Sequence, residues 1–385
     1  MKICVISHAF PYPGIPQFTF VAEICKAMAA QGEEITVIAP QSVFKPVFRH
    51  EPVIPFKQVL KIDGGKDIVV YTPKIITLGT LPFLGTRVNK FFTQWAVTKT
   101  IMKYVTDVDV FYGHFFFEGF HALPEAIRRN KPIIVASGET NVTFRKEYTK
   151  LLKEYLNRLK GIIFVSTKNK DEAIKYGLTD GSNSIILPNS VDASIFKPLD
   201  RKACREKLGF SQDDFIVSFT GYFTHRKGSR RVADAITMLN DETIKSIFIG
   251  RNNEGVEVEP NCKGILYKGF MDHDQIPTYL CASDIFVLPT RAEGCPNAIV
   301  EALACGLPVV SSDRKFNYDV LNDKNSIMVD PDDVEAISKA IKTLKEDPER
   351  RTAMSKAALE MAKSLTIKER ARKIIAFIKQ QTGIN

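Results

Sequence analysis

Apolar residues along the chain alternate between short β-branched runs and longer stretches with helical spacing. In the first half, runs at 3–7, 35–39, 68–71, 110–112, 133–136, 162–165 and 185–187 predict buried strands. The stretch 18–31 repeats apolar residues at helical spacing and ends at Gly32, a common helix stop. Because helices fall between most of the strands, we expect a mainly parallel sheet that helices cover on both faces.

A turn-rich segment with two prolines, PNSVDASIFKP at 188–198, interrupts this alternation and predicts a linker between domains. The alternation then restarts, with strands expected at 215–220, 246–250, 265–269, 285–288 and 308–311. Helices are expected between most of these strands, at 230–239, 275–281 and 298–305, and at 368–380. The pattern therefore predicts an α/β protein with two Rossmann-like doubly wound parallel-sheet domains, 1–190 and 191–365, facing across a cleft.

The composition agrees with two globular domains. The chain has 385 residues, of which 44% are hydrophobic and 25% charged, so it is too apolar for disorder and too long for one core. No apolar run reaches the roughly 18–20 residues of a membrane span, and the first residues read as a strand rather than as a secretory signal. The seven cysteines form no C-x-x-C pair, which predicts reduced thiols in the cytoplasm and argues against zinc ligation.

The net charge of +9 lies mostly in the first half, where residues 1–192 hold 24 Lys and Arg against 17 Asp and Glu. Part of it is local, at Arg145, Lys146, Lys150, Lys153, Arg158, Lys160, Lys168, Lys170 and Lys175. A solvated helical face explains this run, and contact with an anionic membrane or steering of an anionic ligand is the alternative. No nucleic-acid partner is expected, because the usual recognition motifs are missing.

The stretch 87–105 is a second segment for which membrane contact has to be considered. It carries Phe91, Phe92, Trp95 and Tyr104 at helical spacing. The spacing predicts a helix that packs on the core. A helix that leans on a membrane is the alternative.

Common nucleotide and hydrolase motifs are missing from the sequence. There is no G-x-x-x-x-G-K-[ST] loop, no G-x-G-x-x-G after the first strand and no G-x-S-x-G elbow. This argues against P-loop NTPases, nicotinamide or flavin enzymes and α/β-hydrolases. The acid pairs in 107–109 and 272–274 are either metal ligands or, as we prefer, residues at the ends of elements, where Asp usually caps.

Three loops follow predicted strands, where doubly wound sheets bind their ligands. The loop 221–228, GYFTHRKG, places Arg226 and Lys227 near a helix start, which favours phosphate; a surface turn with solvated charges is the alternative. The loop 8–16, HAFPYPGIP, contains Gly14, where the backbone can approach a ligand closely, although a plain proline-rich loop fits equally well.

The third loop, 291–302, has two carboxylates around a helix start. Glu293 lies in the loop and Glu301 inside the helix, while Asn297 and Ala298 after Pro296 would supply N–H donors for an anion. Such a site suits a ligand with both phosphate and hydroxyl groups. The alternative is one capping glutamate and one buried, paired glutamate.

Taken in order, these segments resemble the retaining glycosyltransferases of the two-Rossmann (GT-B) fold, family 4, also called glycosyl transferases group 1. The resemblance covers nearly the whole chain. It is carried by the Glu293…Glu301 pattern within 293–310, the strand DIFVLPT at 284–290, the linker NSVD at 189–192 and the loop 221–228. It implies transfer of a sugar, with retention, from a nucleotide-diphosphate-sugar to a hydroxyl of a glycan or lipid-linked glycan. It also implies that a C-terminal helix, 366–385, crosses back to the first domain.

The resemblance further implies residue roles. Glu301 would bind the donor ribose, Glu293 the donor sugar and Lys227 the diphosphate, with Glu293 and Lys227 as the catalytic residues. The implied donor-binding set is Gly14, Gly221, Tyr222, Arg226, Lys227, Phe270, Glu293, Gly294, Cys295, Asn297, Ala298 and Glu301. No metal or cofactor is implied besides a UDP- or GDP-sugar donor substrate, since cations and a helix start would take the charge of the leaving diphosphate.

Two positions depart from the family pattern. Tyr222 stands where the family usually has Arg, and Arg226 offers the charge from four residues further on. Ser137-Gly138-Glu139 stands where the family often has His-Gly. The acceptor or sugar contacts expected in the first domain are therefore His8, His114, Ser137 and Glu139, although loop or core histidines are the alternative.

Other functions on this fold stay open at this point. They are a nucleotide-sugar 2-epimerase, a sugar phosphorylase and a non-catalytic binder of sugar nucleotides or glycans, the last favoured by Tyr222 and Ser137. For the transferase, front-face substitution is preferred to a covalent intermediate on Glu293. We expect a cytoplasmic enzyme in peripheral contact with an anionic inner membrane face.

Overall fold

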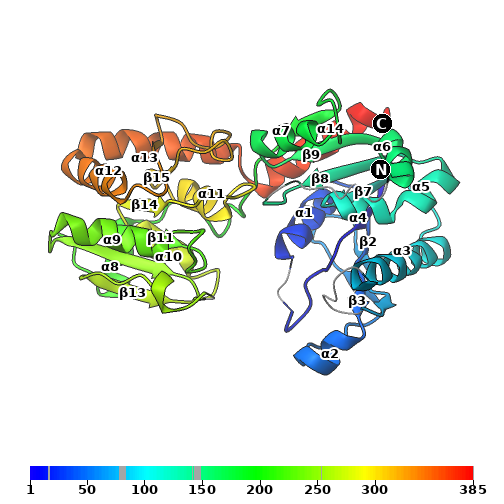
Figure 1. The fold of residues 1–385 in the computed structure, drawn as a ribbon, viewed down its shortest axis with the longest axis horizontal. Coiled ribbons are helices and arrows are strands. Elements are labelled where there is room, and N and C mark those ends of the chain that lie inside the picture. Colours follow the sequence, from blue (N-terminus) through cyan, green and yellow to red (C-terminus); the bar gives the residue numbers. More distant parts are fainter. Residues whose placement is uncertain (16–17, 78–83, 141, 143–148, 253, 385) are drawn as a thin grey trace. The chain divides into compact units, whose positions relative to one another are not determined.

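The computed structural model describes residues 1–15, 18–77, 84–140, 142, 149–252 and 254–384 (Figure 1). It divides into two compact units. Unit 1 comprises Met1–Val165, Asn169–Leu187 and Ile367–Asn385, and unit 2 comprises Ser166–Lys168 and Pro188–Thr366. Pro16, Arg145 and Lys146, which the sequence singled out, lie outside the described residues.

Unit 1 is built on an eight-stranded sheet in which the only antiparallel pair among the described strands is β4 with β5. The order is β10 (Ser184–Ile186), β9 (Leu159–Phe164), β8 (Ile133–Ser137), β7 (Val110–His114), β1 (Lys2–Ile6), β2 (Glu34–Ile38), β5 (Ile68–Tyr71) and β4 (Lys57–Leu60). A separate pair joins β3 (Gln41–Ser42) to β6 (Lys74–Ile75).

Side chains of β1 alternate between two hydrophobic cores, as the pleat of a strand requires. Ile3 and Val5 pack in one core with α1 (Thr19–Ala30) and α14 (Ile367–Thr382). Cys4 and Ile6 pack in the other core, which includes residues of helices on the opposite face. These helices are α3 (Leu84–Tyr104), α4 (Phe116–His121), α5 (Leu123–Arg129), α6 (Thr149–Arg158) and α7 (Thr167–Lys175).

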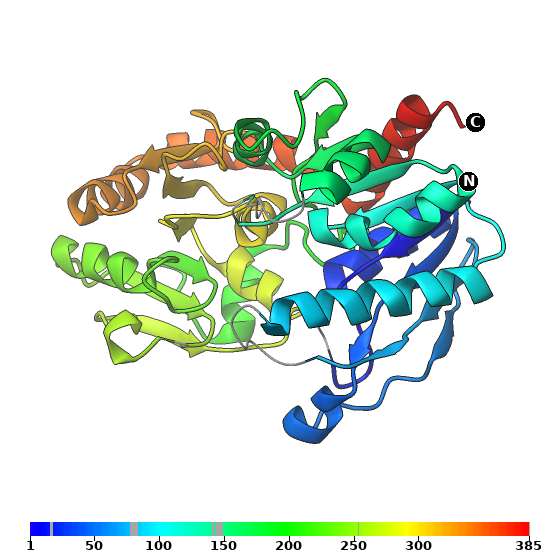
Figure 2. The same ribbon diagram turned by 45° about the vertical axis from the view of Figure 1, so that its right-hand side comes forward.

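Helix α14 is the part of unit 1 that lies farthest away in the sequence. Its residues Ala371, Ile374 and Phe377 are buried in the same core as Val21 and Met28 of α1. In both ribbon views the red α14 lies among the blue and green elements of unit 1 (Figure 1, Figure 2). Unit 1 is therefore completed by a segment that follows all of unit 2 in the chain.

Unit 2 is built on a six-stranded, fully parallel sheet. The order is β13 (Ile265–Gly269), β12 (Ile244–Ile249), β11 (Phe215–Thr220), β14 (Ile285–Leu288), β15 (Val309–Ser312) and β16 (Ser326–Val329). Its helices are α8 (Arg201–Leu208), α9 (Ser229–Leu239), α10 (Ile276–Ala282), α11 (Asn297–Ala304), α12 (Val334–Glu346), α13 (Pro348–Lys363) and the 3₁₀ turn η2 (Val256–Val258). The prediction of an α/β protein with two parallel-sheet domains is thus confirmed.

A buried ion pair sets the register at the centre of unit 2. Asp284, which precedes β14, accepts hydrogen bonds from the Ile216 backbone N–H at 2.7 Å and from Arg205 at 2.8 Å. Both Asp284 and Arg205 are almost fully buried. The acidic residue of the DIFVLPT motif therefore joins β14 to β11 and has a structural role.

Each sheet contains a point at which the strand order reverses. In unit 2, β11 lies between β12 and β14, and in unit 1, β1 lies between β2 and β7. Ligands of doubly wound sheets bind beyond the carboxyl ends of the strands at such a switch point. The loops after β11 and β14, and those after β1 and β7, are therefore the places to look for a site.

Helix α3 corrects one sequence-based expectation. Ala96, Val97 and Ile101 face the core, whereas Phe91 is 65% and Trp95 51% exposed. The predicted helix does pack on the core, but not through Phe91 and Trp95, two of the aromatic residues on which the prediction was based. The helix packs on this core through smaller and β-branched side chains and leaves Phe91 and Trp95 exposed to solvent.

Candidate active site

The loop between β11 and α9 is shaped by two glycines. Gly221 has φ +147°, and a β-carbon there would lie 3.7 Å from Cδ of Lys227, so the lysine side chain passes directly over it. Gly228 caps α9 with φ +83°, and a β-carbon there would lie 2.9 Å from the carbonyl oxygen of Pro289. The loop is thus held against the loop that follows β14, and the Lys227 side chain lies close to the backbone of Gly221.

Glu293 lies at the meeting point of these two loops. Its Oε1 accepts from Arg226 Nη1 at 2.5 Å, from Lys227 Nζ at 2.7 Å and from Thr290 Oγ1 at 2.9 Å. Only 11% of the Glu293 side chain is exposed. The sequence-predicted residues Arg226, Lys227 and Glu293 therefore form one ion-pair network. Both cations contact the same carboxylate oxygen, Oε1 of Glu293.

Helix α11 begins at Asn297, with Pro296 as its N-cap residue. In the described part of the chain, the backbone N–H groups of Asn297 and Ala298 donate to no backbone or side-chain oxygen. Asn189 of the linker fixes the preceding loop, because its Nδ2 donates to the Cys295 carbonyl at 2.9 Å and to Asn297 Oδ1 at 2.7 Å. This leaves a positively polarised helix end beside the ion-pair network.

Glu301 lies inside α11 and is 8% exposed. Its Oε1 lies 3.1 Å from Nε2 of His273, a residue of the turn between β13 and α10. This hydrogen bond and the charge of Glu301 raise the pKa of His273 above its ordinary value. The ring of His273 also packs on Phe196, with centroids 4.9 Å apart.

Sequence reasoning did not connect His273 with Glu301. In the sequence, the segment 272–274 stands out only as an acid pair, which indicates either metal ligands or caps. Within the described ranges, no group of three or more His, Cys, Asp and Glu side chains is arranged to hold a metal ion. The position of the two residues could have linked them, because His273 follows β13 and Glu301 follows β14 at the same edge of one parallel sheet.

Two exposed aromatic residues lie after strands of the same sheet. Tyr222 is 53% exposed after β11, and Phe270 is 55% exposed after β13. The guanidinium carbon of Arg251 stands 3.6 Å from the centre of the Phe270 ring. Gly294 and Cys295 are buried between Glu293 and α11, where their backbone shapes the loop.

The remaining predicted residues belong to unit 1. Gly14, with φ +81°, lies in a tight turn in which Tyr12 and Ile15 exchange backbone hydrogen bonds. His8 follows β1, and His114 ends β7, where it is buried beside Phe20 with ring centroids 5.1 Å apart.

Ser137 and Glu139 follow β8 and bind each other. The Ser137 hydroxyl donates to Glu139 Oε2 at 2.6 Å, and Glu139 Oε1 accepts from the Phe116 N–H at 2.9 Å. Ser137 is fully buried. In this arrangement the pair joins the end of β8 to the start of α4.

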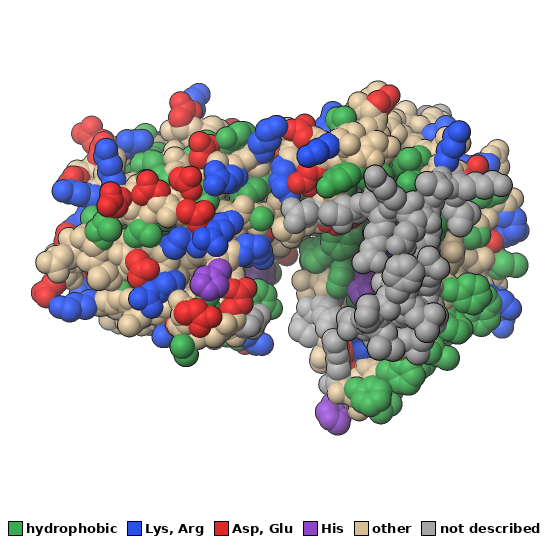
Figure 3. All heavy atoms as spheres, in the orientation of Figure 1, with side chains coloured by type: hydrophobic (Ala, Val, Ile, Leu, Met, Phe, Trp, Pro, Cys, Tyr) green, Lys and Arg blue, Asp and Glu red, His purple; other side chains and the backbone are tan. Residues whose placement is uncertain are grey.

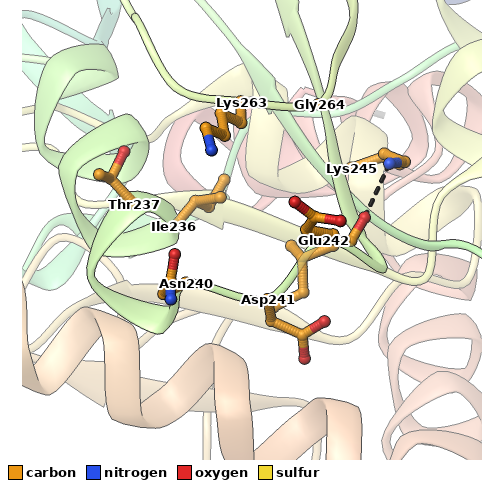
Figure 4. Close-up of a pocket in the computed structure, with 9 residues that line it drawn as sticks. Ile236, Thr237, Asn240, Asp241, Glu242, Lys245, Lys263 and Gly264 are labelled. Carbon is orange, nitrogen blue, oxygen red and sulfur yellow. Dashed lines mark hydrogen bonds between the residues drawn. The ribbon is translucent and has the colours of Figure 1, made fainter.

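A pocket in unit 2 lies away from these loops (Figure 4). It is formed by the end of α9, the start of β12 and the residues before β13, and Lys245 closes one side by donating to the Glu242 carbonyl. Its lining includes Ile236, Asn240 and Lys263. The pocket lies at the amino ends of β12 and β13, opposite the edge where parallel sheets bind ligands.

Comparison with known proteins matches both halves of the chain to glycosyltransferase families. The family model "Glycosyltransferase Family 4" matches residues 17–195, and "Glycosyl transferases group 1" matches residues 200–361. TuaC of Bacillus subtilis, named for teichuronic acid biosynthesis, is 27% identical over 361 residues, which cover 89% of this chain and 88% of TuaC. An Escherichia coli UDP-Gal:alpha-D-GlcNAc-diphosphoundecaprenol alpha-1,3-galactosyltransferase is 28% identical over 48% of this chain and 51% of its own.

Solved structures share the architecture. Sucrose-phosphate synthase from Thermosynechococcus elongatus aligns with a TM-score of 0.77 at 18% identity, over 99% of both chains. HepE from Anabaena in complex with UDP aligns with a TM-score of 0.72 at 17% identity, over 99% of this chain and 100% of HepE. At these identities the likeness shows the fold, which is that of GT-B glycosyltransferases.

Proposed function

Since this chain is a glycosyltransferase of the GT-B fold, with a family 4 domain followed by a group 1 domain, we propose that it moves a sugar from a nucleotide-diphosphate-sugar to a hydroxyl group, with retention of the anomeric configuration. The acceptor is a glycan or a lipid-linked glycan. The observation that carries the proposal is the network in which Arg226 and Lys227 share one oxygen of Glu293.

The donor fits the charges of unit 2. Arg226, Lys227 and the free N–H groups at the start of α11 can together take the two negative charges of a diphosphate. Glu301 accepts hydroxyl hydrogen bonds well, so the donor ribose would replace His273 as its partner. Glu293, released from one cation by the diphosphate, would turn to the hydroxyls of the donor sugar.

The same network supports front-face substitution over a double displacement. Glu293 Oε1 accepts from three donors before the donor binds, and in the proposed complex the carboxylate accepts hydrogen bonds from sugar hydroxyls, both of which weaken it as a nucleophile. In the proposed step, the bond from the anomeric carbon to the diphosphate breaks, and the acceptor oxygen bonds from the same face. The acceptor proton passes to the departing phosphate oxygen, while Arg226 and Lys227 stabilise its charge without a metal ion.

Screening and product analysis test this function. A panel of UDP- and GDP-sugars should raise the melting temperature for at least one donor, by mass action. That donor, with undecaprenyl-diphosphate-linked saccharides as acceptors, should yield an α-linked product from an α-linked donor by ¹H NMR, and added EDTA should leave the rate unchanged. Donor conversion without acceptor would indicate an epimerase. Binding without turnover of any donor would indicate a non-catalytic binder.

We also propose that unit 1 makes peripheral contact with an anionic bilayer. No described helix is long and apolar enough to cross a membrane. On the short helix α2 (Phe44–Arg49), however, Val47 is 64% and Phe48 75% exposed. Figure 3 shows hydrophobic side chains gathered in this part of unit 1.

Helix α3 adds aromatic–lysine pairs of the kind that suit a lipid interface. The Lys99 ammonium stands 5.2 Å from the ring centre of the exposed Trp95, and Lys103 stands equally close to Tyr104. The lysines supply the charge that an anionic headgroup requires. Because all seven cysteines are free thiols, we place this contact at the cytoplasmic face.

Co-sedimentation tests the contact. At low salt the protein should pellet with vesicles of phosphatidylglycerol and phosphatidylcholine, and several-fold less with phosphatidylcholine alone. Phe48→Glu and Trp95→Glu should each reduce pelleting several-fold. Val256→Glu is the matched control, because Val256 is an 84% exposed apolar residue of unit 2. Wild-type protein that stays in the supernatant would contradict the proposal.

A further inference from the structure

The two loops of the site in unit 2 are joined to each other by hydrogen bonds. The Arg291 backbone N–H donates to the Arg226 carbonyl at 2.9 Å, and Arg226 Nη1 donates to the Ala292 carbonyl at 2.6 Å. In the proposed function, however, the Arg226 guanidinium turns to the donor diphosphate. Only a residue that does not contact the donor can provide a joint that is the same before and after the donor binds.

Arg231 joins the same two loops from the side of helix α9. Its Nη1 donates to the His225 carbonyl at 2.8 Å, and its Nη2 donates to the Pro289 carbonyl at 2.7 Å. His225 directly precedes the two cations of the first loop, and Pro289 opens the loop that carries Glu293. One planar guanidinium thus spans the bases of both loops, a geometry that a fork of donors provides and a single ammonium does not.

The structure holds this guanidinium in one place. Arg231 lies in the first turn of α9, so a helix rather than a loop carries it. A β-carbon on Gly228 would lie 2.6 Å from Nη2 and 2.9 Å from Cζ of Arg231, so the lack of a side chain at Gly228 makes room for the group. Nε is buried and has no hydrogen-bond partner in the part of the chain that the structure describes. The two carbonyls are therefore the contacts that orient the side chain.

The charge of Arg231 has little compensation within the fold. Burial and the neighbouring charge of Arg291 lower its pKa, whereas Asp332 raises it. Asp332 is itself the ion-pair partner of Arg291, at 2.7 Å. Among the described residues, the hydrogen bonds of the Arg231 side chain go to backbone carbonyls and none goes to a carboxylate. A half-buried guanidinium without an ion-pair partner costs stability, which indicates that Arg231 serves the site rather than the fold.

The joint is needed because the other contact between the loops changes when the donor binds. Lys227 Nζ lies 2.7 Å from Glu293 Oε1, and this contact crosses from one loop to the other. When a diphosphate draws Lys227 away from Glu293, the contact no longer holds the loops together. The two carbonyl bonds of Arg231 persist, because they involve no group that the donor takes up.

We propose that Arg231 is a positioning residue of the donor site: it holds the loop of Arg226 and Lys227 against the loop of Glu293, so that the cations are aligned when the diphosphate arrives and stay aligned as it departs. The proposal rests on the proposed function, because the diphosphate is that of the donor. Arg231 itself contacts no substrate and acts through Lys227.

Hydrogen exchange in the free protein tests the joint itself. The backbone N–H of Arg291 reports on it, because its acceptor is the Arg226 carbonyl of the other loop. Arg231→Met should speed its exchange about tenfold or more, the effect of losing a hydrogen bond to a charged group, while the N–H of Phe286 inside β14 keeps its rate. Arg230→Met is the matched control, because Arg230 is the preceding residue of α9 and lies in a surface ion pair. Equal exchange of the Arg291 N–H in the two variants would overturn the proposal.

Calorimetric titration with UDP and GDP tests the link to the donor site without any transfer reaction. Arg231→Met should weaken binding of the nucleoside diphosphate about tenfold in the wild-type background. In a Lys227→Ala background it should change the affinity less than about twofold, because effects are non-additive when one residue acts through another. Equal factors in both backgrounds would show a general structural effect and contradict the positioning role.

Arg231→Lys separates geometry from charge. It keeps the positive charge but lacks the fork that spans two carbonyls, so its affinity for UDP or GDP should stay within about threefold of that of Arg231→Met. Wild-type affinity in Arg231→Lys would mean that the charge suffices without the joint, which overturns the proposal. Circular dichroism melting curves of each variant exclude unfolding as the cause of a lost affinity.

The two proposals fail in different ways. Wild-type protein that binds neither UDP nor GDP would disprove the donor site, and with it any positioning role of Arg231 at that site. Wild-type protein that binds one of them, together with an Arg231→Met variant that behaves as Arg230→Met, would disprove the role of Arg231 and leave the donor site standing.

Discussion

Glu293 in unit 2 and Glu118 in unit 1 occupy corresponding places, each near the carboxyl ends of the strands at a switch point. They differ in the number of cations and hydrogen-bond donors around the carboxylate. Glu293 is neutralised by Arg226, Lys227 and Thr290. Within the described residues, Glu118 has one ion-pair partner, His8, at 3.8 Å. A site for an anion needs cations that are held in place before the ligand arrives, and a carboxylate is their natural counter-charge. Glu118 instead lies in apolar surroundings without a cation of this kind, so burial raises its pKa.

The largest effect expected from this contrast is on turnover in unit 2. Lys227→Ala should lower kcat about 100-fold or more, because it removes a cation aimed at the charge that develops on the leaving diphosphate. The measurement is steady-state transfer with the donor found by screening. Lys342→Ala, an exposed lysine of α12 paired with Glu346, is the control and should keep wild-type kinetics. Equal turnover in both variants would remove Lys227 from the mechanism.

The next effect concerns the stability of unit 1. Burial, with Glu139 nearby, raises the pKa of Glu118 from 4.5 to about 7. A raised pKa means that stability is fully present below about pH 4.5 and is lost as the pH rises through about 7. Glu118→Gln should therefore stabilise the protein at pH 8, on the order of 1–3 kcal/mol, and have little effect at pH 4.5.

Denaturant unfolding at the two pH values measures this difference, with Glu154→Gln, a change of a half-exposed glutamate of α6, as the control at both. A Gln variant that is no more stable than wild type at pH 8 would show that Glu118 is not an unpaired buried carboxylate.

A smaller effect is expected on donor affinity. Glu301→Gln should raise the donor KM about tenfold with little change in kcat, because a charged acceptor for the ribose hydroxyls becomes neutral. Glu346→Gln, an exposed glutamate of α12, is the control. A kcat loss without a KM change would place Glu301 at the reacting sugar and not at the ribose.

The smallest effect is a shift in one titration curve. Glu301 raises the pKa of His273, so the imidazole signals of His273 should titrate above 6.5 in wild-type protein. Glu301→Gln should move the midpoint back toward 6.5, and saturating donor should do the same if the ribose displaces His273. If saturating donor leaves the titration midpoint of His273 unchanged, the ribose does not contact Glu301.

Much of the architecture could be predicted from the sequence, because its strands are continuous apolar runs bounded by turns. The strands at 68–71, 215–220, 265–269 and 285–288 begin and end where the pattern predicts. The antiparallel edge strand β4 was missed, since Lys57–Leu60 is only partly buried and carries no such run. Helix α4 was missed as well, because its sequence, FFEGFH, has no helical period and contains a glycine.

Polar residues of the two units differ in the same respect. The loops of unit 2 hold glycine, proline and charged residues at fixed spacings, so the sequence alone indicates Arg226, Lys227, Glu293 and Glu301. Glu118 and His121 stand in no motif, and their burial depends on the packing of α4 on β7. His273 likewise became visible only when the sheet brought the loops after β13 and β14 together.

The course of the chain also bears on synthesis. Unit 1 obtains Ala371, Ile374, Ile375, Phe377 and Ile378 of its core from α14, whereas unit 2 is nearly continuous from Pro188 to Thr366. During synthesis, unit 1 emerges first, but its core stays incomplete and apolar surface stays exposed until α14 has been made. Unit 2 emerges before α14 as one nearly continuous segment. We therefore expect unit 2 to fold before unit 1, the reverse of the usual order in multidomain chains.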